Sequence, residues 1–440
     1  MTPDAPRVVS ITAGGAGMFC GSCMRDNALA AAARRLGVPV MLVPTFTPIR
    51  TDEEDVTSEQ VWLGGVNVYL EETWPWIGRL PRPLRRLLDH PRLLRAVSKM
   101  ALQTRRDDDG KLAISLLRGL AGRQAPATRD LIDNLLASEP EVVNVSNLLV
   151  AGFVPGFKDR VEIPVVATLQ GDDIFLDTLS ASDRRDALAE MRRIASRIDA
   201  FVVFSRDYAD RMATLLEIPR ERFHIVPLGL SAPETFFDAE PAIDPDRPPT
   251  VGYLARICPE KGFHRLVEAF LLLRRNPGTE QARLVFGGWL GALDREFFDK
   301  QMTTIDDAGA SAAITHLELP DRDSKIRLLR EIDVFSVPTT YREPKGLYVL
   351  EALAAGIPVV QPEHGAFPEL LASTGGGVLV PPDESHALAD ALHQLLIDPE
   401  QRRRLGKEGR MGVNAHQTAE AMARATIDVW RQVGRSYSEP

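Results

Sequence analysis

Short apolar segments alternate with amphipathic helices in two successive series, and this alternation restricts the fold more than any other feature. Strands that are apolar along their whole length belong to parallel sheets that helices cover on both faces. The sequence therefore predicts an α/β protein with two doubly wound parallel sheets. The first series has apolar runs at 7–13, 39–46, 141–147, 164–171, 200–205 and 223–230; the second has them at 250–256, 282–288, 313–318, 333–339, 358–362 and 376–382.

A proline-rich, acidic stretch separates the two series. Residues 231–249 show no periodicity and are predicted to form an interdomain linker. This divides the chain into a first domain at 1–230 and a second domain at 250–417. A last amphipathic helix, within about 418–440, lies beyond the second series and is predicted to return to the first domain.

Bulk properties exclude several classes of protein. The net charge of −9 argues against a general nucleic-acid binder. No apolar run approaches the roughly 18–20 residues that span a bilayer, and the amino-terminal residues lack the basic region of a signal peptide. Three cysteines do not make a disulfide framework, which fits a reducing compartment. We therefore expect a cytoplasmic protein.

Two glutamates separated by seven residues mark the stretch 341–365. Proline and glycine after Glu343 place it on a loop, and a helix is expected from about Gly346 to Gly356. The amides of that first turn can bind phosphate. Glu351, one turn further along the helix, can accept hydrogen bonds from a ribose diol. Glu343, on the loop, can contact sugar hydroxyls. On spacing alone, an ordinary amphipathic helix with one buried and one solvated glutamate is an equally good interpretation.

Two cations stand where the second series begins. Arg256 follows a strand and Lys261 precedes a helix, so both charges fall at the edge of the sheet where a diphosphate would bind. The alternative is a pair of surface bases.

The first series opens with a glycine-rich turn, Gly14 and Gly15 among its residues, that would let backbone approach a ligand closely. It lacks a clean G-x-G-x-x-G register and an acidic residue after the second strand, so a nicotinamide dinucleotide is disfavoured. Ligands of such sheets bind beyond the carboxyl ends of the strands. Candidate pocket residues there are Asn147, Gln170, Asp172, Ser205 and Gly229.

Two further features have more than one interpretation. Cys20 and Cys23 form a C-x-x-C pair at a helix start, which can serve redox or metal chemistry or can simply pack as small residues near a ligand loop. Residues 74–106 are basic and amphipathic, with nine Arg or Lys and one Asp between 79 and 106. That segment can contact an anionic membrane surface, bind an anionic acceptor, or form solvated helices.

Three stretches resemble retaining glycosyltransferases of family 4: the glycine-rich loop at 14–17, GYLARICPEKGFHRLVEAF at 252–270 and EPKGLYVLEALAAGIPVV at 343–360. The resemblance implies the GT-B fold, in which two Rossmann-like domains face a cleft. It also implies transfer of a sugar from a UDP-, GDP- or ADP-sugar to an acceptor (a glycan, lipid or small molecule) without a cofactor. Two rival interpretations stay open, a GT-B-fold nucleotide-sugar epimerase and a non-catalytic nucleotide-sugar-binding protein.

The resemblance also implies roles for individual residues. Arg256 and Lys261 would neutralise the diphosphate, so no metal is expected, and Glu343 would contact the donor sugar as the third catalytic residue. Gln170 stands where many members have a histidine, which puts that histidine's contribution to the donor sugar in doubt. The remaining donor-binding residues would be Glu351, Gly346, Leu347, Gly14, Gly15 and Gly287, and the acceptor or sugar side would hold Gln170, Asp172 and Asn147.

Overall fold

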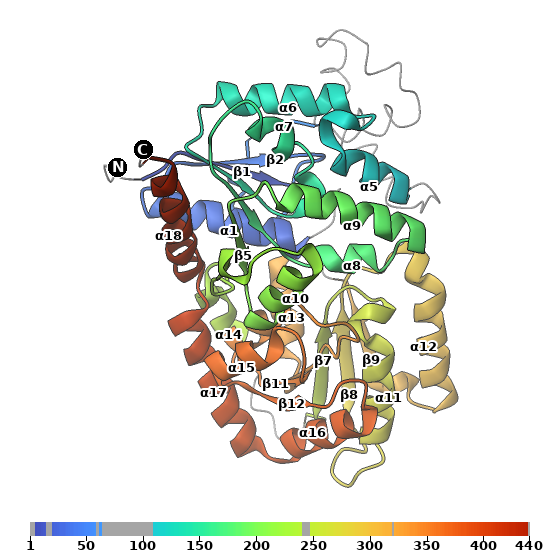
Figure 1. Ribbon diagram of the computed structural model, residues 1–440. Coiled ribbons are helices and arrows are strands. Elements are labelled where there is room, and N and C mark those ends of the chain that lie inside the picture. The colour runs from blue at the N-terminus through green and yellow to red at the C-terminus, as the bar shows by residue number, and fades with distance from the viewer. Residues whose placement is uncertain are drawn as a thin grey trace. The chain divides into compact units, whose positions relative to one another are not determined.

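A computed structural model describes most of the chain, and its compact units follow the two series of the sequence. The described residues are 5–14, 20–58, 61–63, 109–239, 247–318 and 321–438. The first unit comprises Met1–Gly229 and Ala419–Pro440, and the second comprises Leu230–Thr418. Each unit contains a single twisted sheet with helices around it (Figure 1).

The first unit is built on six parallel strands in the order β2-β1-β3-β4-β5-β6. Strand order reverses beside β1, where Ile11 pairs with Val43 on one side and Val145 on the other. This reversal is the switch point at which open α/β sheets bind ligands. The strands are β1 (Val8–Thr12), β2 (Val40–Pro44), β3 (Val142–Val145), β4 (Val165–Thr168), β5 (Ala200–Val203) and β6 (Phe223–Ile225).

Helices cover this sheet because their apolar faces meet buried strand residues. Leu131, Phe157, Met191 and Phe201 are fully buried in one continuous core with the strands. The helices are α1 (Gly21–Arg35), α5 (Asp109–Leu117), α6 (Ala125–Ala137), α7 (Val154–Lys158), α8 (Asp172–Leu176), α9 (Ala181–Ala195), α10 (Arg206–Leu216) and α18 (Ala419–Ser438).

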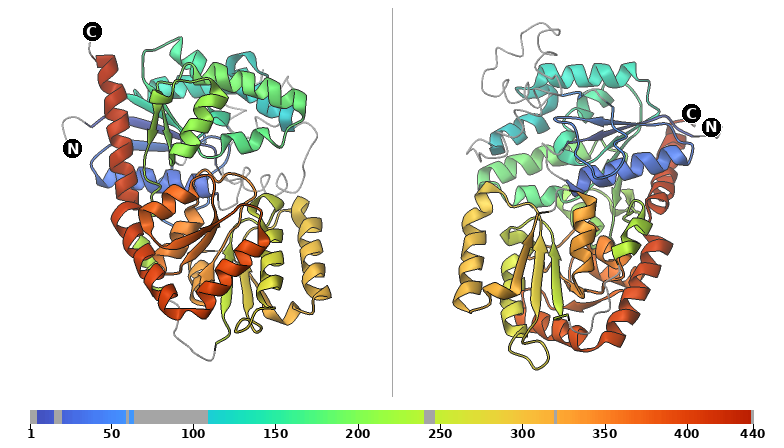
Figure 2. Two further views of the ribbon diagram at one scale, coloured as in Figure 1. Left: turned by 60° about the horizontal axis from the view of Figure 1, so that its bottom comes forward. Right: turned by 180° about the vertical axis from the view of Figure 1, so that it is seen from behind.

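The last helix, α18, packs along α1 of the first unit (Figure 2). It buries Trp430 completely. Near its end, the hydroxyl of Tyr437 accepts from Lys158 Nζ at 2.5 Å and donates to Asp199 at 2.7 Å. These contacts tie the end of the chain to the sheet that the beginning of the chain forms.

The second unit has six parallel strands in the order β12-β11-β10-β7-β8-β9. Its core is rich in aromatic residues, such as Phe263 and Phe286, whose ring centroids lie 4.8 Å apart. The strands are β7 (Thr250–Leu254), β8 (Arg283–Gly287), β9 (Ile314–Leu317), β10 (Val334–Phe335), β11 (Val359–Pro362) and β12 (Gly377–Val380), and the helices are α11 (Phe263–Leu273), α12 (Arg295–Asp307), α13 (Arg322–Arg330), α14 (Leu347–Ala354), α15 (Phe367–Thr374), α16 (Ser385–Ile397) and α17 (Pro399–His416).

The two parallel sheets confirm the predicted fold class. The basic segment 74–106, on which the possible membrane contact depends, lies outside the described residues, as does Gly15. Within the described ranges, none of the helices has the combination of length and apolarity that crossing a membrane requires.

Candidate functional site

Two loops at the carboxyl edge of the second sheet are packed tightly together. Gly262, in the loop after β7, has φ +69°, and a Cβ there would lie 1.7 Å from the carbonyl oxygen of Pro338 in the loop after β10. The amide of Thr340 donates to the carbonyl of Glu260 at 3.1 Å. A side chain at Gly262 would force these loops apart, so the glycine allows Lys261 to reach residues that follow β10.

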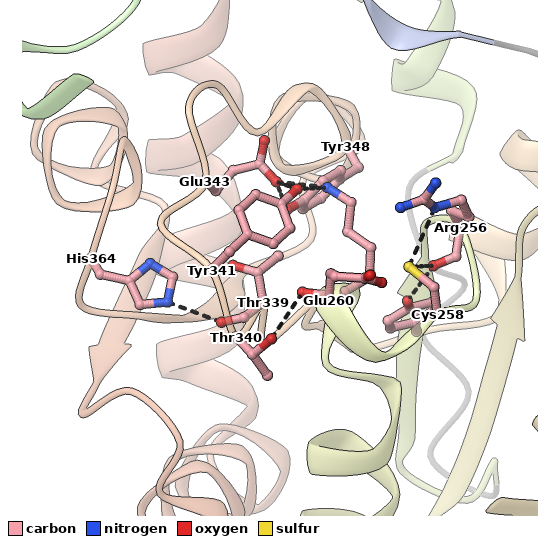
Figure 3. A network of polar contacts seen from close by, with 11 residues as sticks. Arg256, Cys258, Glu260, Thr339, Thr340, Tyr341, Glu343, Tyr348 and His364 are labelled. Atoms are coloured by element: carbon pink, nitrogen blue, oxygen red, sulfur yellow. Dashed lines mark hydrogen bonds and ion pairs between the residues drawn. The ribbon is translucent and has the colours of Figure 1, made fainter. Parts of the chain in front are cut away.

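Four side chains from these loops and α14 meet at one carboxylate oxygen (Figure 3). Glu343 Oε2 accepts from Lys261 Nζ at 2.7 Å and from the hydroxyls of Tyr341 and Tyr348 at 2.9 Å each. Lys261 Nζ also donates to the hydroxyl of Tyr341 at 2.5 Å. The ammonium lies 5.1 and 4.9 Å from the ring centroids of Tyr341 and Tyr348, within the range of cation–π attraction.

The charge state of this cluster follows from its burial and its contacts. Glu343 is only 2% exposed. Burial alone would raise the pKa of Glu343, but the charge of Lys261 and the hydrogen bonds from Lys261 and both tyrosines lower it to about 2. Burial and the nearby Glu343 charge raise the pKa of Tyr341 and of Tyr348 well above 10. The site therefore holds an ionised carboxylate with two protonated phenols.

The loop after β11 fixes the backbone of Glu343 from another side. The amide of Ala366 donates to the carbonyl of Glu343 at 2.8 Å. Gly365 has φ +59°, and a Cβ there would lie 2.4 Å from the same carbonyl oxygen. His364 contributes a contact at 2.9 Å between its Nε2 and the carbonyl oxygen of Thr339. The position of Glu343 thus depends on backbone packing as well as on its side-chain donors.

Helix α14 begins at Leu347, directly after Gly346, whose φ is +83°. Glu351 lies in its second turn, as the spacing predicts, and is 5% exposed. Its carboxylate accepts from Lys325 Nζ on α13 at 3.1 Å. Sequence reasoning missed Lys325, because nothing in its local pattern indicates that α13 brings it beside α14.

Arg256 lies just beyond the end of β7, and its side chain and backbone contact residues other than Lys261 and Glu343. Its Nε donates to Cys258 Sγ at 3.3 Å, and its backbone carbonyl accepts from the hydroxyl of Tyr253 at 2.9 Å. The predicted Gly287 ends β8 and accepts a hydrogen bond from Ala255. Gly288 is the position that requires glycine, since its φ is +150° and a Cβ would lie 1.7 Å from the Ala255 carbonyl oxygen.

In the first unit, Gly14 allows a close approach between parts of the chain itself. Its φ is +87°, and a Cβ would lie 2.1 Å from the carbonyl oxygen of Thr47. This contact with the segment after β2 is sufficient reason for a glycine there. The neighbouring turn residues 15–19 are outside the described residues.

Gln170 joins a buried polar cluster at the carboxyl edge of the first sheet. Its Nε2 donates to the carbonyl of Ser146 at 3.0 Å and to Asp26 Oδ1 at 3.3 Å, and its Oε1 accepts from Arg25 Nε at 3.4 Å. Arg25 and Asp26 form an ion pair at 2.7 Å with both side chains 1% exposed. Burial lowers the pKa of Arg25, although the charge of Asp26 opposes the shift. No motif in the sequence indicates this ion pair.

Asp172 and Asn147 use their side chains to hold local backbone. Asp172 accepts from the amides of Leu148 at 2.6 Å and of Gln170 at 2.9 Å. Burial raises the pKa of Asp172 to about 6, although these two hydrogen bonds oppose the shift. Asn147 Oδ1 accepts from the amide of Val150 at 3.1 Å. Both residues lie at the strand ends, where the sequence predicts them, and each has a structural partner there.

The C-x-x-C pair lies at the start of α1. Cys20 is the residue before the helix, and Cys23 is buried in the first turn. The hydrogen bond with Cys20, together with burial, strongly raises the pKa of the Cys23 thiol. Over the part of the chain that the structure describes, no group of three or more His, Cys, Asp or Glu is placed to hold a metal ion.

Comparison with known families matches most of each unit. The "Glycosyl transferases group 1" family matches residues 236–411, and the "Glycosyl transferase 4-like domain" family matches residues 25–229. The chain belongs to the group 1 glycosyl transferases. This assignment confirms the family that the glycine-rich loop and the two motifs of the second unit indicate.

Curated relatives carry names of glycosyltransferases. The chain is 30% identical to D-inositol 3-phosphate glycosyltransferase of Nocardia farcinica over 269 residues, which cover 57% of each chain. It is 26% identical to glycogen synthase of Mycobacterium tuberculosis over 309 residues, which cover 68% of this chain and 71% of the relative. The match to the first relative thus spans a little over half of that protein's length.

Solved structures support the fold. Sucrose-phosphate synthase of Thermosynechococcus elongatus aligns with a TM-score of 0.68 and 18% identity, covering 98% of this chain and 100% of that chain. Anabaena HepE, solved in complex with UDP and glucose, aligns with a TM-score of 0.65 and 15% identity, covering 97% and 100%. At these identities the likeness shows the GT-B architecture alone, and that architecture was predicted.

The buried Glu343 carboxylate predicts a specific loss of stability in acid. Because its folded pKa lies below the ordinary value of 4.5, its stabilising contribution is present above that value and is lost as the pH falls toward 2. The wild type should lose roughly 3 kcal/mol more than Glu343→Gln as the pH falls through this window. Urea denaturation of both proteins at pH 6, 5, 4 and 3 would follow the upper part of that loss, and parallel losses would contradict the prediction.

Proposed function

We propose that this protein transfers a sugar from a nucleoside diphosphate sugar to an acceptor, with retention at the anomeric carbon. One observation carries the proposal. Lys261 at the edge of the second sheet contacts Glu343 at 2.7 Å, directly before the helix that bears Glu351. This arrangement combines a cation, a helix amino terminus and two carboxylates, which suit a diphosphate and the hydroxyls of two sugars.

The leaving diphosphate needs positive charge as the sugar–oxygen bond breaks. We assign Lys261 and Arg256 to that charge, together with the amides at the start of α14 around Gly346 and Leu347. Once they contact the bound diphosphate, such groups stabilise developing negative charge without reorganisation during the reaction. Gly287 ends the strand next to β7 and allows close backbone approach on the same edge.

The two glutamates divide the remaining donor contacts. Glu351 accepts from the ribose hydroxyls, and its ion pair with Lys325 keeps the carboxylate oriented for that contact. Glu343 accepts from a hydroxyl of the transferred sugar, since an ionised carboxylate is an acceptor with no proton to give.

The first unit supplies the acceptor side in this proposal. The turn at Gly14 and the strand ends with Asn147, Gln170 and Asp172 form its carboxyl edge, where ligands of such sheets bind. The relatives' names agree on sugar transfer and differ between inositol phosphate and glycogen. They support the reaction class and leave the acceptor open among glycans, lipids and small molecules.

A screen of sugar nucleotides tests the proposal directly. A ligand that binds only the folded state stabilises it by about 2.7 kcal/mol when present at 100 times its dissociation constant. One member of a panel of UDP-, GDP- and ADP-sugars should therefore raise the melting temperature well above the others. If no donor raises the melting temperature and none yields product with glycan, lipid or small-molecule acceptors, the proposal is wrong.

Replacement of Lys261 should remove most of the transfer activity. Lys261→Ala takes a positive charge from the leaving diphosphate, and we expect kcat to fall about 10²–10³-fold or more. Lys300→Ala, an exposed lysine on α12, is the matched control. Initial rates with the donor found in the screen, alongside circular dichroism to verify folding, measure the effect. Wild-type turnover in Lys261→Ala would contradict the assignment.

We also propose that the protein cations take the place that a metal ion has in some other transferases. Transfer should then persist at an unchanged rate after dialysis against EDTA and assay in the presence of EDTA. Loss of activity in EDTA, with recovery on adding Mg²⁺ or Mn²⁺, would show that Arg256 and Lys261 do not suffice.

A further inference from the structure

In the proposed function, Lys261 has two anionic partners, Glu343 and the diphosphate of the donor. Its ammonium contacts Glu343 at 2.7 Å, yet the reaction needs that charge on the diphosphate. The side chain of Glu343 is 3% exposed, while that of Lys261 is 17% exposed, so the carboxylate is enclosed and the lysine faces the open side. If Lys261 turns toward a diphosphate, Glu343 loses its counter-ion in a buried position, which is strongly unfavourable without other donors.

The two tyrosines provide those donors. Tyr341 lies in the loop two residues before Glu343, and Tyr348 lies in the first turn of α14. Their hydroxyls converge on the same oxygen, Oε2, at 2.9 Å each. Both hydrogen bonds can persist when the ammonium leaves, because each hydroxyl contacts Oε2 directly; Tyr341 then loses only the hydrogen bond that it accepts from Lys261 Nζ. Hydrogen bonds to the ionised form keep a carboxylate charged.

The tyrosine rings also bear on the movement of the lysine. The ammonium lies about equally far from both ring centroids, at 5.1 and 4.9 Å. A cation that moves along these faces stays in attractive contact while it exchanges one anionic partner for another. The rings therefore lower the penalty for separating Lys261 from Glu343.

The orientation of Glu343 follows from the same contacts. The three donors all contact Oε2, and Figure 3 shows the other carboxylate oxygen directed away from them. That second oxygen, Oε1, is the one placed to accept from a substrate hydroxyl. A sugar that presents a carboxylate or phosphate at this point would meet a like charge.

We infer that Tyr341 and Tyr348 are positioning residues, which hold Glu343 ionised and aimed at the donor sugar while Lys261 moves to the diphosphate. This inference rests on the proposed function. It assigns the tyrosines a role beyond packing and makes the site selective for a donor sugar with a free hydroxyl opposite Glu343.

Phenylalanine substitutions test the inference because they remove only the hydroxyls and keep the rings. The variants are Tyr341→Phe, Tyr348→Phe and the double variant. On the acidic side of the plot of kcat against pH (the acidic limb), the apparent pKa should rise by about one to two pH units for each hydroxyl removed. The KM for the donor should change by less than about threefold, since all three variants keep Arg256, Lys261 and Glu351. A purely structural role would lower the melting temperature and leave the acidic limb in place.

Tyr437→Phe is the matched control. Its hydroxyl also contacts a lysine and a carboxylate, but in the first unit and on the last helix. This variant should leave the acidic limb unchanged. If the wild type transfers sugar and every variant has the same acidic limb as the wild type, the role of the tyrosines is wrong and the proposed function stands. Absence of transfer by the wild type with every donor would overturn the proposed function, and the inference with it.

Discussion

The second unit is organised around a carboxylate that is buried and charged at the same time. An ionised Glu343 at 2% exposure is tolerable only with several donors close by, and the structure supplies three of them on one oxygen. Those donors come from two loops and one helix. The buried charge therefore constrains the loops after β7 and β10 and the start of α14 together, and the close contacts at Gly262 and Gly365 allow that convergence.

Parallel sheet topology explains how residues far apart in the sequence reach one carboxylate. Lys261 and Glu343 are separated by 82 positions, yet β7 and β10 are neighbours, so their carboxyl ends lie on the same edge. Lys261 lies in the loop that follows β7, and Glu343 lies in the loop that follows β10. The sheet therefore determines which loops meet, and the loop residues determine what chemistry takes place there.

Sequence patterns predicted the fold and part of the site for identifiable reasons. Continuous apolar strands define parallel sheets, and the proline and glycine after Glu343 place it on a loop before the helix of Glu351. The role of Tyr348 could not be predicted, because the residue lies in the apolar first turn of a helix, where the pattern predicts an ordinary core residue. Lys325 could not be recognised either, since its partner is 26 positions away on another helix. Such contacts depend on packing between elements, which local periodicity does not report.

Two of the buried ion pairs in the described part of the chain differ in a way that bears on function. Arg25 and Asp26 are adjacent in α1, both 1% exposed, and the same cluster encloses Gln170, so this pair has no route to another partner without exposing the core. Lys261 is partly exposed, and Glu343 has two further donors that do not move with it. A buried pair with both partners equally enclosed is costly to separate, because either partner alone would be an uncompensated buried charge. A pair in which the cation alone faces solvent, and the anion keeps other donors, can open for a ligand.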